Sequence, residues 1–581
     1  MVRSRVVVVF VMLVAAMPAA RAAQPDFMSR ALECRGSSDG ASKVSRPGPY
    51  DERTVEHVRL ASDVDGDSVD IGIVRPVVPD GVLVPVIARG SPYFFGGPAG
   101  DPGLCVEMLA ENYVQHGYAV AVIPIRGTAD NGGCFDYMGP AERADLDKAV
   151  RWLGTQPWSN GSVGMIGLSY DGSTPWEVAG MGNPYLKTIV PISGVNDIFA
   201  LMHGSGLHEA RGAGLLTALY YAYGFANYNV TNGRSAPHMA SGAACPATAQ
   251  ALAADGWALA TGERDPLGFY AARNLRPLVE ENYRGSILLT HGLQDWNVEP
   301  GHAYPWVNSL EDRGIYVQHM LGQWGHSYPD RHSNGLSQRG DWADMLLTWF
   351  DRWLKGDESV ELGARAEVQD HAGRWRRADS WPPRATTVTT LHLNADGRLG
   401  GAPGAQTGVR PLLPFTLGRI GADGCTGCDH VAYFESEAVE TETRFAGRPA
   451  VAITVTPSAS SGHITAHLYA GQGESIYRVG WGGVDLRFPR GGERAQAVVP
   501  GVPMNAQIDL EPLDVVLQPG DKLWLTLTQG TYSDHVPVTP APAVVSVGAG
   551  ASTLRLGVFS VSDEQYFSPR WIDDVAPDQP A

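Results

Sequence analysis

The sequence is short of basic residues. Its 581 residues include 44 lysines and arginines against 62 aspartates and glutamates, a formal net charge of −18. Nucleic acids and anionic membrane surfaces attract cationic proteins, so this balance argues against both as partners. Hydrophobic residues make up 44% of the chain. That share is enough to bury large cores, and the length suggests two to four domains.

Apolar runs long enough to span a bilayer are also lacking. The run from Val6 to Met17 is too short to cross a membrane, and it follows Arg3 and Arg5. Ala20-Arg21-Ala22 then fits the cleavage site of a secretory signal peptide, with no cysteine there to mark a lipoprotein. We therefore expect residues 1–22 to be a signal peptide and the protein to be secreted or periplasmic, without membrane insertion after cleavage. A retained signal anchor is the alternative.

Cysteine is scarce, with six residues in the chain. An even number in an oxidising compartment favours disulfides. Cys105 and Cys134 follow two neighbouring predicted strands, which favours a bond between them and leaves Cys34 for Cys245.

Metal-ligating patterns are weak. Cys425 and Cys428 form a C-x-x-C pair, but a zinc site would need further ligands and only His430 is near. We expect a local disulfide there. The acidic run from Asp63 to Asp70 resembles a calcium loop in spacing but lacks the glutamate and length of an EF-hand, so it predicts a polar hairpin turn. No metal and no cofactor is expected.

Strands and helices alternate between about residues 55 and 357, which is typical of an α/β fold. Several strand candidates are continuous apolar runs, as expected of parallel strands covered on both faces. The predicted strands are 82–88, 119–125, 163–168, 188–192, 287–290 and 316–321, and the clearest helices are 141–153 and 342–354.

Two further regions depart from this alternation. About 90 residues separate Gly194 from Ser286, too many for one connection, and their composition predicts a mostly helical cap over residues 195–285. Beyond residue 357, short β-rich runs punctuated by glycine and proline predict an all-β sandwich. We expect a catalytic domain over 23–357 and the sandwich over 358–581, with strands at 387–393, 450–455, 464–469 and 523–527.

Six residues from Gly167 to Gly172 predict a nucleophile. They follow an apolar run and precede a predicted helix, with Ser169 at the apex. This arrangement resembles the nucleophile elbow G-x-S-x-G of α/β-hydrolases, although the second glycine comes one position late. Glycine removes side chains where strand and helix nearly touch.

A serine needs a base and an orienting carboxylate, which follow in the order Ser, Asp, His in α/β-hydrolases. Asp295 comes just after the strand 287–290, and His326 just after the strand 316–321. Both therefore belong in loops at the strand ends, and we predict Ser169, Asp295 and His326 as a catalytic triad. His332 is the alternative base. The backbone amide of Tyr170 and the phenol of Tyr93 are the predicted oxyanion donors.

In these residues the chain resembles the X-prolyl dipeptidyl-peptidase and cocaine-esterase group of serine hydrolases. The similar segments are 156–172, 126–128, 91–93, 349–356 and 381–383. The elbow of that group reads G-x-S-Y-x-G, which accounts for the late glycine. The resemblance implies an α/β-hydrolase domain with a helical cap and a C-terminal jelly-roll domain. It also implies the same triad and oxyanion residues.

The resemblance leaves the substrate open between peptides and small acyl compounds. The segment 291–298 is similar to the Xaa-Pro dipeptidyl-peptidases, and so is Arg273-Asn274, whereas Leu168 and the segment 195–199 depart from them. We expect a dipeptidyl-peptidase, with an esterase or amidase as the alternative. A surface- or glycan-binding role of the sandwich is a second alternative, and a homo-oligomer is compatible with the sequence.

A dipeptidyl-peptidase must also bind the substrate ammonium and the proline ring. A carboxylate would pair with the ammonium, and Asp197 and Glu209 are the candidates. Trp176 and Tyr220 are the predicted aromatic walls of a proline pocket.

Overall fold

The computed structural model describes most of the chain from residue 42 to residue 569. The described residues are 42–92, 107–128, 131–203, 207, 245, 248, 250, 264–265, 267–331, 339–383, 387–413, 419–421, 424–426, 431–530, 541–559 and 565–569. The expected signal peptide, most of the expected cap and Cys34, Cys105 and Cys428 lie outside them. Among the described residues, no helix has the length and apolar character needed to cross a membrane.

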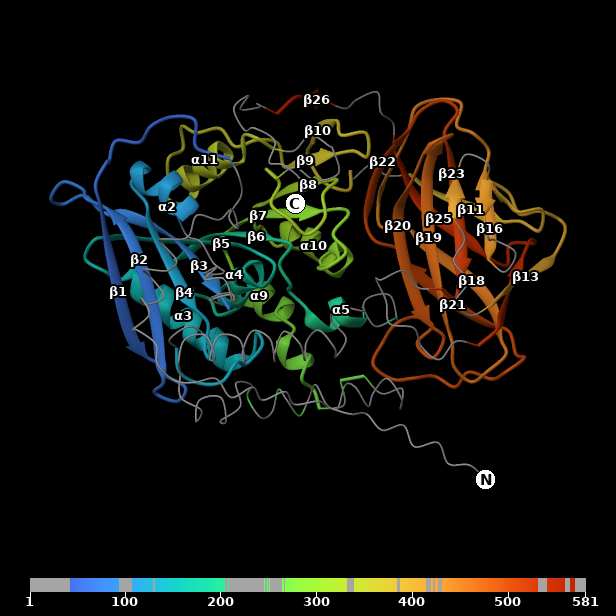
Figure 1. Cartoon of the computed structure of the whole chain (residues 1–581), viewed down its shortest axis with the longest axis horizontal. Coiled ribbons are helices and arrows are strands. Elements are labelled where there is room, and N and C mark those ends of the chain that lie inside the picture. Colours follow the sequence, from blue (N-terminus) through green and yellow to red (C-terminus); the bar gives the residue numbers. More distant parts are fainter. Residues whose placement is uncertain are drawn as a thin grey trace, which may run out of the picture.

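The first sheet has eleven strands, and its centre is parallel (Figure 1). β3 to β9 run parallel, while β1, β2, β10 and β26 pair antiparallel at the edges. In sheet order the strands are β1 (Arg53–Ala61), β2 (Ser68–Pro76), β4 (Ala119–Pro124), β3 (Val84–Ser91), β5 (Ser159–Leu168), β6 (Leu186–Ile192), β7 (Ser286–Gly292), β8 (Val317–Gly322), β9 (Ala366–Gln369), β10 (Trp375–Ala378) and β26 (Gln565–Phe567).

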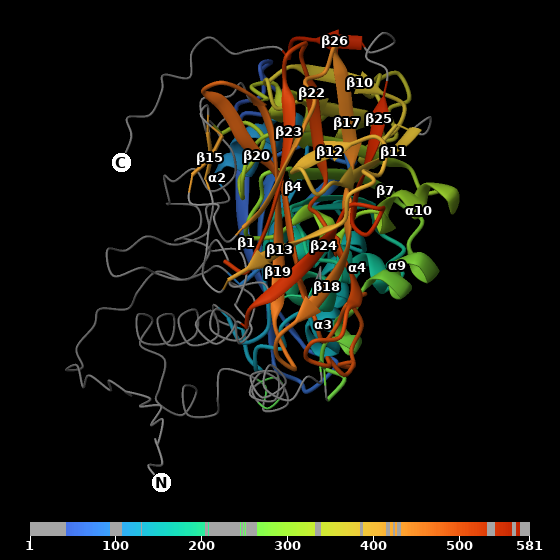
Figure 2. The same ribbon diagram turned by 90° about the vertical axis from the view of Figure 1, so that its right-hand side faces the viewer.

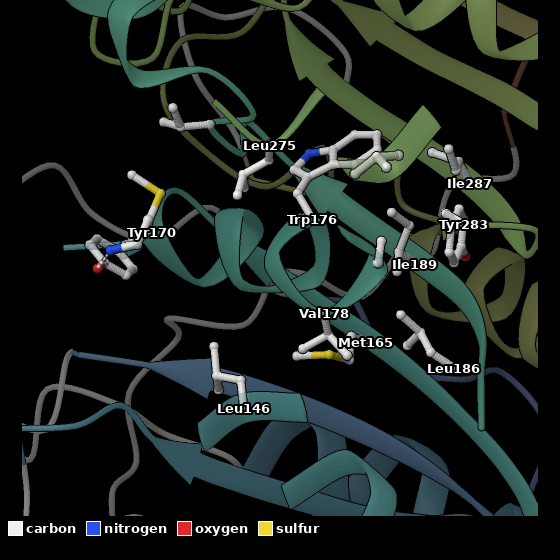
Figure 3. Close-up of a cluster of buried hydrophobic side chains, with 14 of the residues drawn as sticks. Leu146, Met165, Tyr170, Trp176, Val178, Leu186, Ile189, Leu275, Tyr283 and Ile287 are labelled. Atoms are coloured by element: carbon white, nitrogen blue, oxygen red, sulfur yellow. Dashed lines mark hydrogen bonds between the residues drawn. The ribbon is translucent and has the colours of Figure 1, made fainter. Parts of the chain in front are cut away.

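Helices cover both faces of this sheet, which explains why the central strands are apolar throughout. Neighbouring residues of β7 belong to different cores. Ile287 and Leu289 belong to the core that also contains residues of α3, α4, α9 and α10, whereas Leu288 belongs to the core that contains residues of α2 and α11. Figure 3 shows part of the first core around α4. The helices are α2 (Glu107–Tyr113), α3 (Pro140–Gly154), α4 (Tyr170–Gly180), α5 (Ile198–His203), α9 (Arg276–Asn282), α10 (Trp306–Asp312) and α11 (Trp342–Leu354).

The six predicted strands and two predicted helices of this region are all present; α11 has the predicted bounds, and each of the other elements differs from its prediction at one end or both. β5, for example, begins at Ser159 rather than at 163, because Ser159 pairs with Val84 of β3. The sheet also continues past the expected domain boundary at residue 357, since β9 pairs with β8 and β10 pairs with β9.

The C-terminal part consists of strands, as predicted, and stands beside the first sheet (Figures 1 and 2). Thirteen strands form one branched sheet, and a separate hairpin joins β14 (Arg419–Gly421) to β15 (Gly424–Thr426). All four predicted strands are present. The thirteen are β11 (Thr387–Leu393), β12 (Arg398–Gly400), β13 (Gly408–Leu412), β16 (Ala432–Ser436), β17 (Thr443–Gly447), β18 (Ala450–Pro457), β19 (His463–Gln472), β20 (Ser475–Asp485), β21 (Met504–Asp509), β22 (Leu513–Leu517), β23 (Lys522–Thr528), β24 (Ala543–Val547) and β25 (Thr553–Phe559).

Among the described residues, a disulfide joins Cys134 to Cys245. The predicted pairs Cys105–Cys134 and Cys34–Cys245 are therefore wrong. The backbone amide of Cys245 donates to the carbonyl of Phe135 at 3.1 Å, so residue 245 lies against the loop after β4. The predicted bond between Cys425 and Cys428 involves a residue outside the described part of the chain.

The acidic run between β1 and β2 forms the predicted hairpin turn. Its carboxylates pair with protein cations: Asp63 with Lys148, and Asp65 with Arg126. Within β2, Asp70 binds Arg59 at 2.7 Å. These pairs give the run a structural explanation that needs no metal ion.

Candidate active site

Three loops place Ser169, Asp295 and His326 at one edge of the parallel sheet. β5 ends at Leu168, β7 at Gly292 and β8 at Gly322. These ends are nearly level, because Leu168 lies opposite Ile192 of β6 and Ile192 lies opposite Thr290 of β7. The carboxyl edge of an open parallel sheet is where α/β proteins bind ligands.

The turn at Ser169 has the geometry of a nucleophile elbow. Ser169 has φ 65° and ψ −126°, a conformation that is strained for a residue with a side chain. Its amide donates to the carbonyl of Ile192 at 3.0 Å. A Cβ on Gly172 would lie 2.5 Å from that same carbonyl oxygen and 3.1 Å from the Cα of Gly194. The late glycine is thus required because α4 crosses the end of β6 at residue 172.

Asp295 and His326 form a hydrogen-bonded pair. His326 Nδ1 donates to Asp295 Oδ2 at 2.8 Å. The other oxygen, Oδ1, accepts the amides of Asn297 at 2.9 Å and Val298 at 3.0 Å. Burial alone would raise the pKa of the fully buried Asp295, but His326, His291 and the Asn297 amide together hold that pKa below its usual value. Asp295 is therefore an ionised carboxylate that fixes the orientation of the His326 ring.

Two more buried histidines support the Asp295 loop. His291 Nε2 donates to the carbonyl of Val298 at 2.7 Å and lies 3.7 Å from Asp295 Oδ2. His302 Nδ1 lies 2.6 Å from the carbonyl of Glu299, and its Nε2 lies 3.2 Å from that of Gly194. Burial lowers the pKa of both rings, that of His302 to about 3, so both are neutral. Their positions suit a structural role better than that of a base.

Tyr170, the first residue of α4, contributes its two polar groups to different places. Its amide belongs to the first turn of the helix, where N–H groups lack partners within the helix. Its phenol is buried, donates to Glu142 at 2.8 Å and accepts the amide of Met138 at 2.9 Å. Figure 3 shows the side chain at one end of α4. The amide can therefore serve as an oxyanion donor while the phenol anchors the elbow. Tyr93, the other predicted donor, lies outside the described residues.

Sequence patterns did not reveal an acidic pair near Tyr170, whose phenol donates to one of the two carboxyl groups. Glu142 of α3 and Glu177 of α4 are both fully buried. Burial raises the pKa of Glu142 to about 8, and burial together with Glu142 raises that of Glu177 well above its usual value. The two groups are therefore largely protonated at neutral pH.

Two predicted substrate residues do not fit their expected roles. Trp176 is 0% exposed and lies in the core around α4 (Figure 3). Its ring contacts that of Trp306, with centroids 5.5 Å apart. Asp197 is also buried; it lies 3.3 Å from Arg276 and caps α5 through the amide of Ala200. Trp176 is thus no pocket wall, and the charge of Asp197 is already paired. Glu209, Tyr220 and the alternative base His332 lie outside the described part of the chain.

Comparison with known proteins identifies the family. Residues 65–328 match the family model described as X-Pro dipeptidyl-peptidase (S15 family), and residues 359–556 match the X-Pro dipeptidyl-peptidase C-terminal non-catalytic domain. The chain belongs to the S15 family. A Streptomyces avermitilis relative named "Putative Xaa-Pro dipeptidyl-peptidase" is 26% identical, over 90% of this chain and 86% of its own. A Mycobacterium tuberculosis relative named "Putative serine esterase MT1883" is 24% identical, over 74% of this chain and 81% of its own.

The fold of this S15 protein matches that of solved hydrolases. An α-amino acid ester hydrolase superposes with a TM-score of 0.68 at 18% identity, covering 91% of this chain and all of that one. An aminopeptidase from a marine sediment archaeon gives the same TM-score at 17% identity. The S15 chain is therefore an α/β-hydrolase with an all-strand C-terminal domain, and its family makes it a serine hydrolase.

Proposed function

We propose that the protein is a secreted or periplasmic Xaa-Pro dipeptidyl-peptidase that releases N-terminal dipeptides through an acyl-enzyme. The observation that carries the proposal is the 2.8 Å hydrogen bond between His326 and a buried, ionised Asp295, at the same sheet edge as the strained Ser169. The S15 family match and the names of the relatives support the peptide substrate.

The reaction follows from the orientation of the imidazole. Because Nδ1 donates to Asp295, Nε2 is the ring nitrogen that takes the proton of the Ser169 hydroxyl. The serine oxygen then attacks the carbonyl carbon of the second substrate residue. The negative oxygen of the tetrahedral intermediate accepts a hydrogen bond from the Tyr170 amide and, in this proposal, from the Tyr93 phenol.

Collapse of that intermediate breaks the peptide bond. The imidazolium of His326 gives its proton to the departing amine, and the dipeptide remains as an ester on Ser169. Water, deprotonated by His326, attacks the ester and releases the dipeptide as a carboxylic acid. Asp295 stays ionised throughout and stabilises the imidazolium each time it forms.

Recognition of a free N-terminus needs a carboxylate that Asp197 does not supply, since Asp197 faces Arg276. Glu209 remains the candidate ammonium partner, and Tyr220 the candidate wall of the proline pocket. Both residues belong to the proposed cap.

An esterase or amidase is the second candidate, favoured by the serine esterase among the relatives. Hydrolysis of Ala-Pro-anilide and of a phenyl butyrate ester separates the two, with Ser169→Ala as control. The proposal expects efficient cleavage of the anilide and no activity of the variant. Cleavage of the ester alone would favour the esterase, and an active Ser169→Ala protein would refute the triad.

A further inference from the structure

The segment that follows Asp295 is held by side chains of the C-terminal domain. Trp481 of β20 donates from its indole nitrogen to Glu299 at 3.0 Å. Glu511, between β21 and β22, accepts the amide of Gly301 at 2.6 Å. Arg448, between β17 and β18, donates to the carbonyl of Tyr304 at 3.3 Å. Glu299, Gly301 and Tyr304 are thus each hydrogen-bonded to a side chain of the C-terminal domain.

The contact between the segment 299–304 and the C-terminal domain is buried and tightly packed. Trp481 is 1% exposed and Glu511 is 4% exposed. A Cβ on Gly301 would lie 2.6 Å from both carboxylate oxygens of Glu511. The amide of Glu511 donates to the carbonyl of Trp481 at 2.8 Å, which ties the two contacts together. Breaking a buried hydrogen bond leaves an unpaired polar group, which costs free energy.

Residues next to this segment also contact Asp295 and the backbone that supports the elbow. Val298, one residue before Glu299, donates its amide to Asp295 Oδ1 at 3.0 Å. His302, one residue after Gly301, lies 3.2 Å from the carbonyl of Gly194, the residue that packs on Gly172 of the elbow. A shift of residues 299–302 would therefore disturb both the Asp295 carboxylate and the support of the elbow.

We propose that Glu511 and Trp481 are positioning residues of the reaction, which hold the segment 299–302 so that Asp295 keeps its place against His326. This inference rests on the proposed triad. It assigns the C-terminal domain a part in catalysis, although that domain contributes none of the proposed catalytic residues.

The test uses the full chain with the variants Glu511→Ala, Glu511→Gln and Trp481→Phe. Trp349→Phe is the matched control. Trp349 lies on α11, is as buried as Trp481, and donates from its indole nitrogen to Thr188 at 2.8 Å rather than to the segment 299–302. For each variant, kcat and KM are measured on Ala-Pro-anilide, together with the rate at which a fluorophosphonate labels Ser169 and the midpoint of thermal unfolding.

The inference predicts a loss confined to the chemical step. Glu511→Ala should lower kcat roughly 10- to 100-fold, the scale of a small misplacement of catalytic groups, with a parallel fall in labelling rate. KM should change less than about threefold, because the loss lies in the transition state. Glu511→Gln should recover most of kcat, since its amide oxygen can still accept from Gly301. Trp481→Phe should lose more kcat than Trp349→Phe at equal thermal stability.

Each outcome has a distinct meaning. If Glu511→Ala and Trp481→Phe keep the kcat of Trp349→Phe, the positioning role is wrong. If Glu511→Ala does not fold, the comparison of the two tryptophan variants decides by the same criterion. Failure of the proposed function looks different: Ser169→Ala would retain activity, or the wild type would leave the anilide uncut.

Discussion

Gly172 offers the sharpest structural test of the elbow. In Gly172→Ala, the new Cβ would stand 2.5 Å from the Ile192 oxygen, 2.8 Å from the Gly167 oxygen and 3.1 Å from the Gly194 Cα. All three are backbone atoms of β5, β6 or the turn that follows, so no side chain can rotate away. Overpacking of this kind costs about 1–3 kcal/mol. Alanine in a helix is otherwise more favourable than glycine by up to about 1 kcal/mol. A net loss of stability in Gly172→Ala would therefore show that the new Cβ meets the backbone of β5 and β6.

The effect on activity should exceed the effect on stability. Relief of the contact moves the start of α4 and Ser169 with it, and a displacement near 1 Å costs on the order of 100-fold in rate. Urea unfolding and kcat on Ala-Pro-anilide measure the two effects, with Gly401→Ala as control because a Cβ there meets nothing within 4 Å. If Gly172→Ala is as stable and as active as Gly401→Ala, the close approach of α4 to β6 is refuted.

Three further predictions test the surroundings of the site. Because burial raises the pKa of Glu142 from 4.5 to about 8, the folded state binds more protons between those values, and stability should fall by about 1.4 kcal/mol per pH unit as pH rises through that window. Glu142→Gln should reduce this slope in urea melts, with the rest contributed by Glu177, whose pKa is also raised, and an unchanged slope would contradict the burial argument. Replacing Cys134 and Cys245 by serine opens a link between residues 111 apart and should lower the free energy of unfolding by about 2–5 kcal/mol; an unchanged urea midpoint would count against that link. Asp295→Asn should lower kcat by about four orders of magnitude with the fold intact, and a loss under tenfold would remove Asp295 from the reaction.

The sequence could predict what depends on local pattern. Continuous apolar runs identified the central strands, because parallel strands buried on both faces must be apolar throughout. The elbow, and the placement of Asp295 and His326 just past strand ends, were readable for the same reason: the parallel topology decides which loops meet. Short strands such as β9 carry too few residues to show a pattern, so the continuation of the first sheet beyond residue 357 was missed.

What the sequence could not predict depends on contacts between distant residues. Trp176 looked like a pocket wall because it is aromatic and near the elbow, but α4 is buried on every side and Trp176 faces Trp306. Asp197 looked available because nothing nearby in the sequence reveals its pairing with Arg276. The pairing of Cys134 with Cys245 could not be predicted for the same reason, since the two residues are 111 positions apart. Glu511, more than 200 residues after Asp295, gave no local sign of its contact with Gly301.

The most direct test of the account is the ratio of kcat/KM for Ala-Pro-anilide to that for N-acetyl-Ala-Pro-anilide. An Xaa-Pro dipeptidyl-peptidase that uses the free ammonium should cleave the first and leave the second essentially uncut, with neither cleaved by Ser169→Ala. Equal cleavage of both anilides, or cleavage of the acetylated one alone, would contradict the proposed dipeptidyl-peptidase activity.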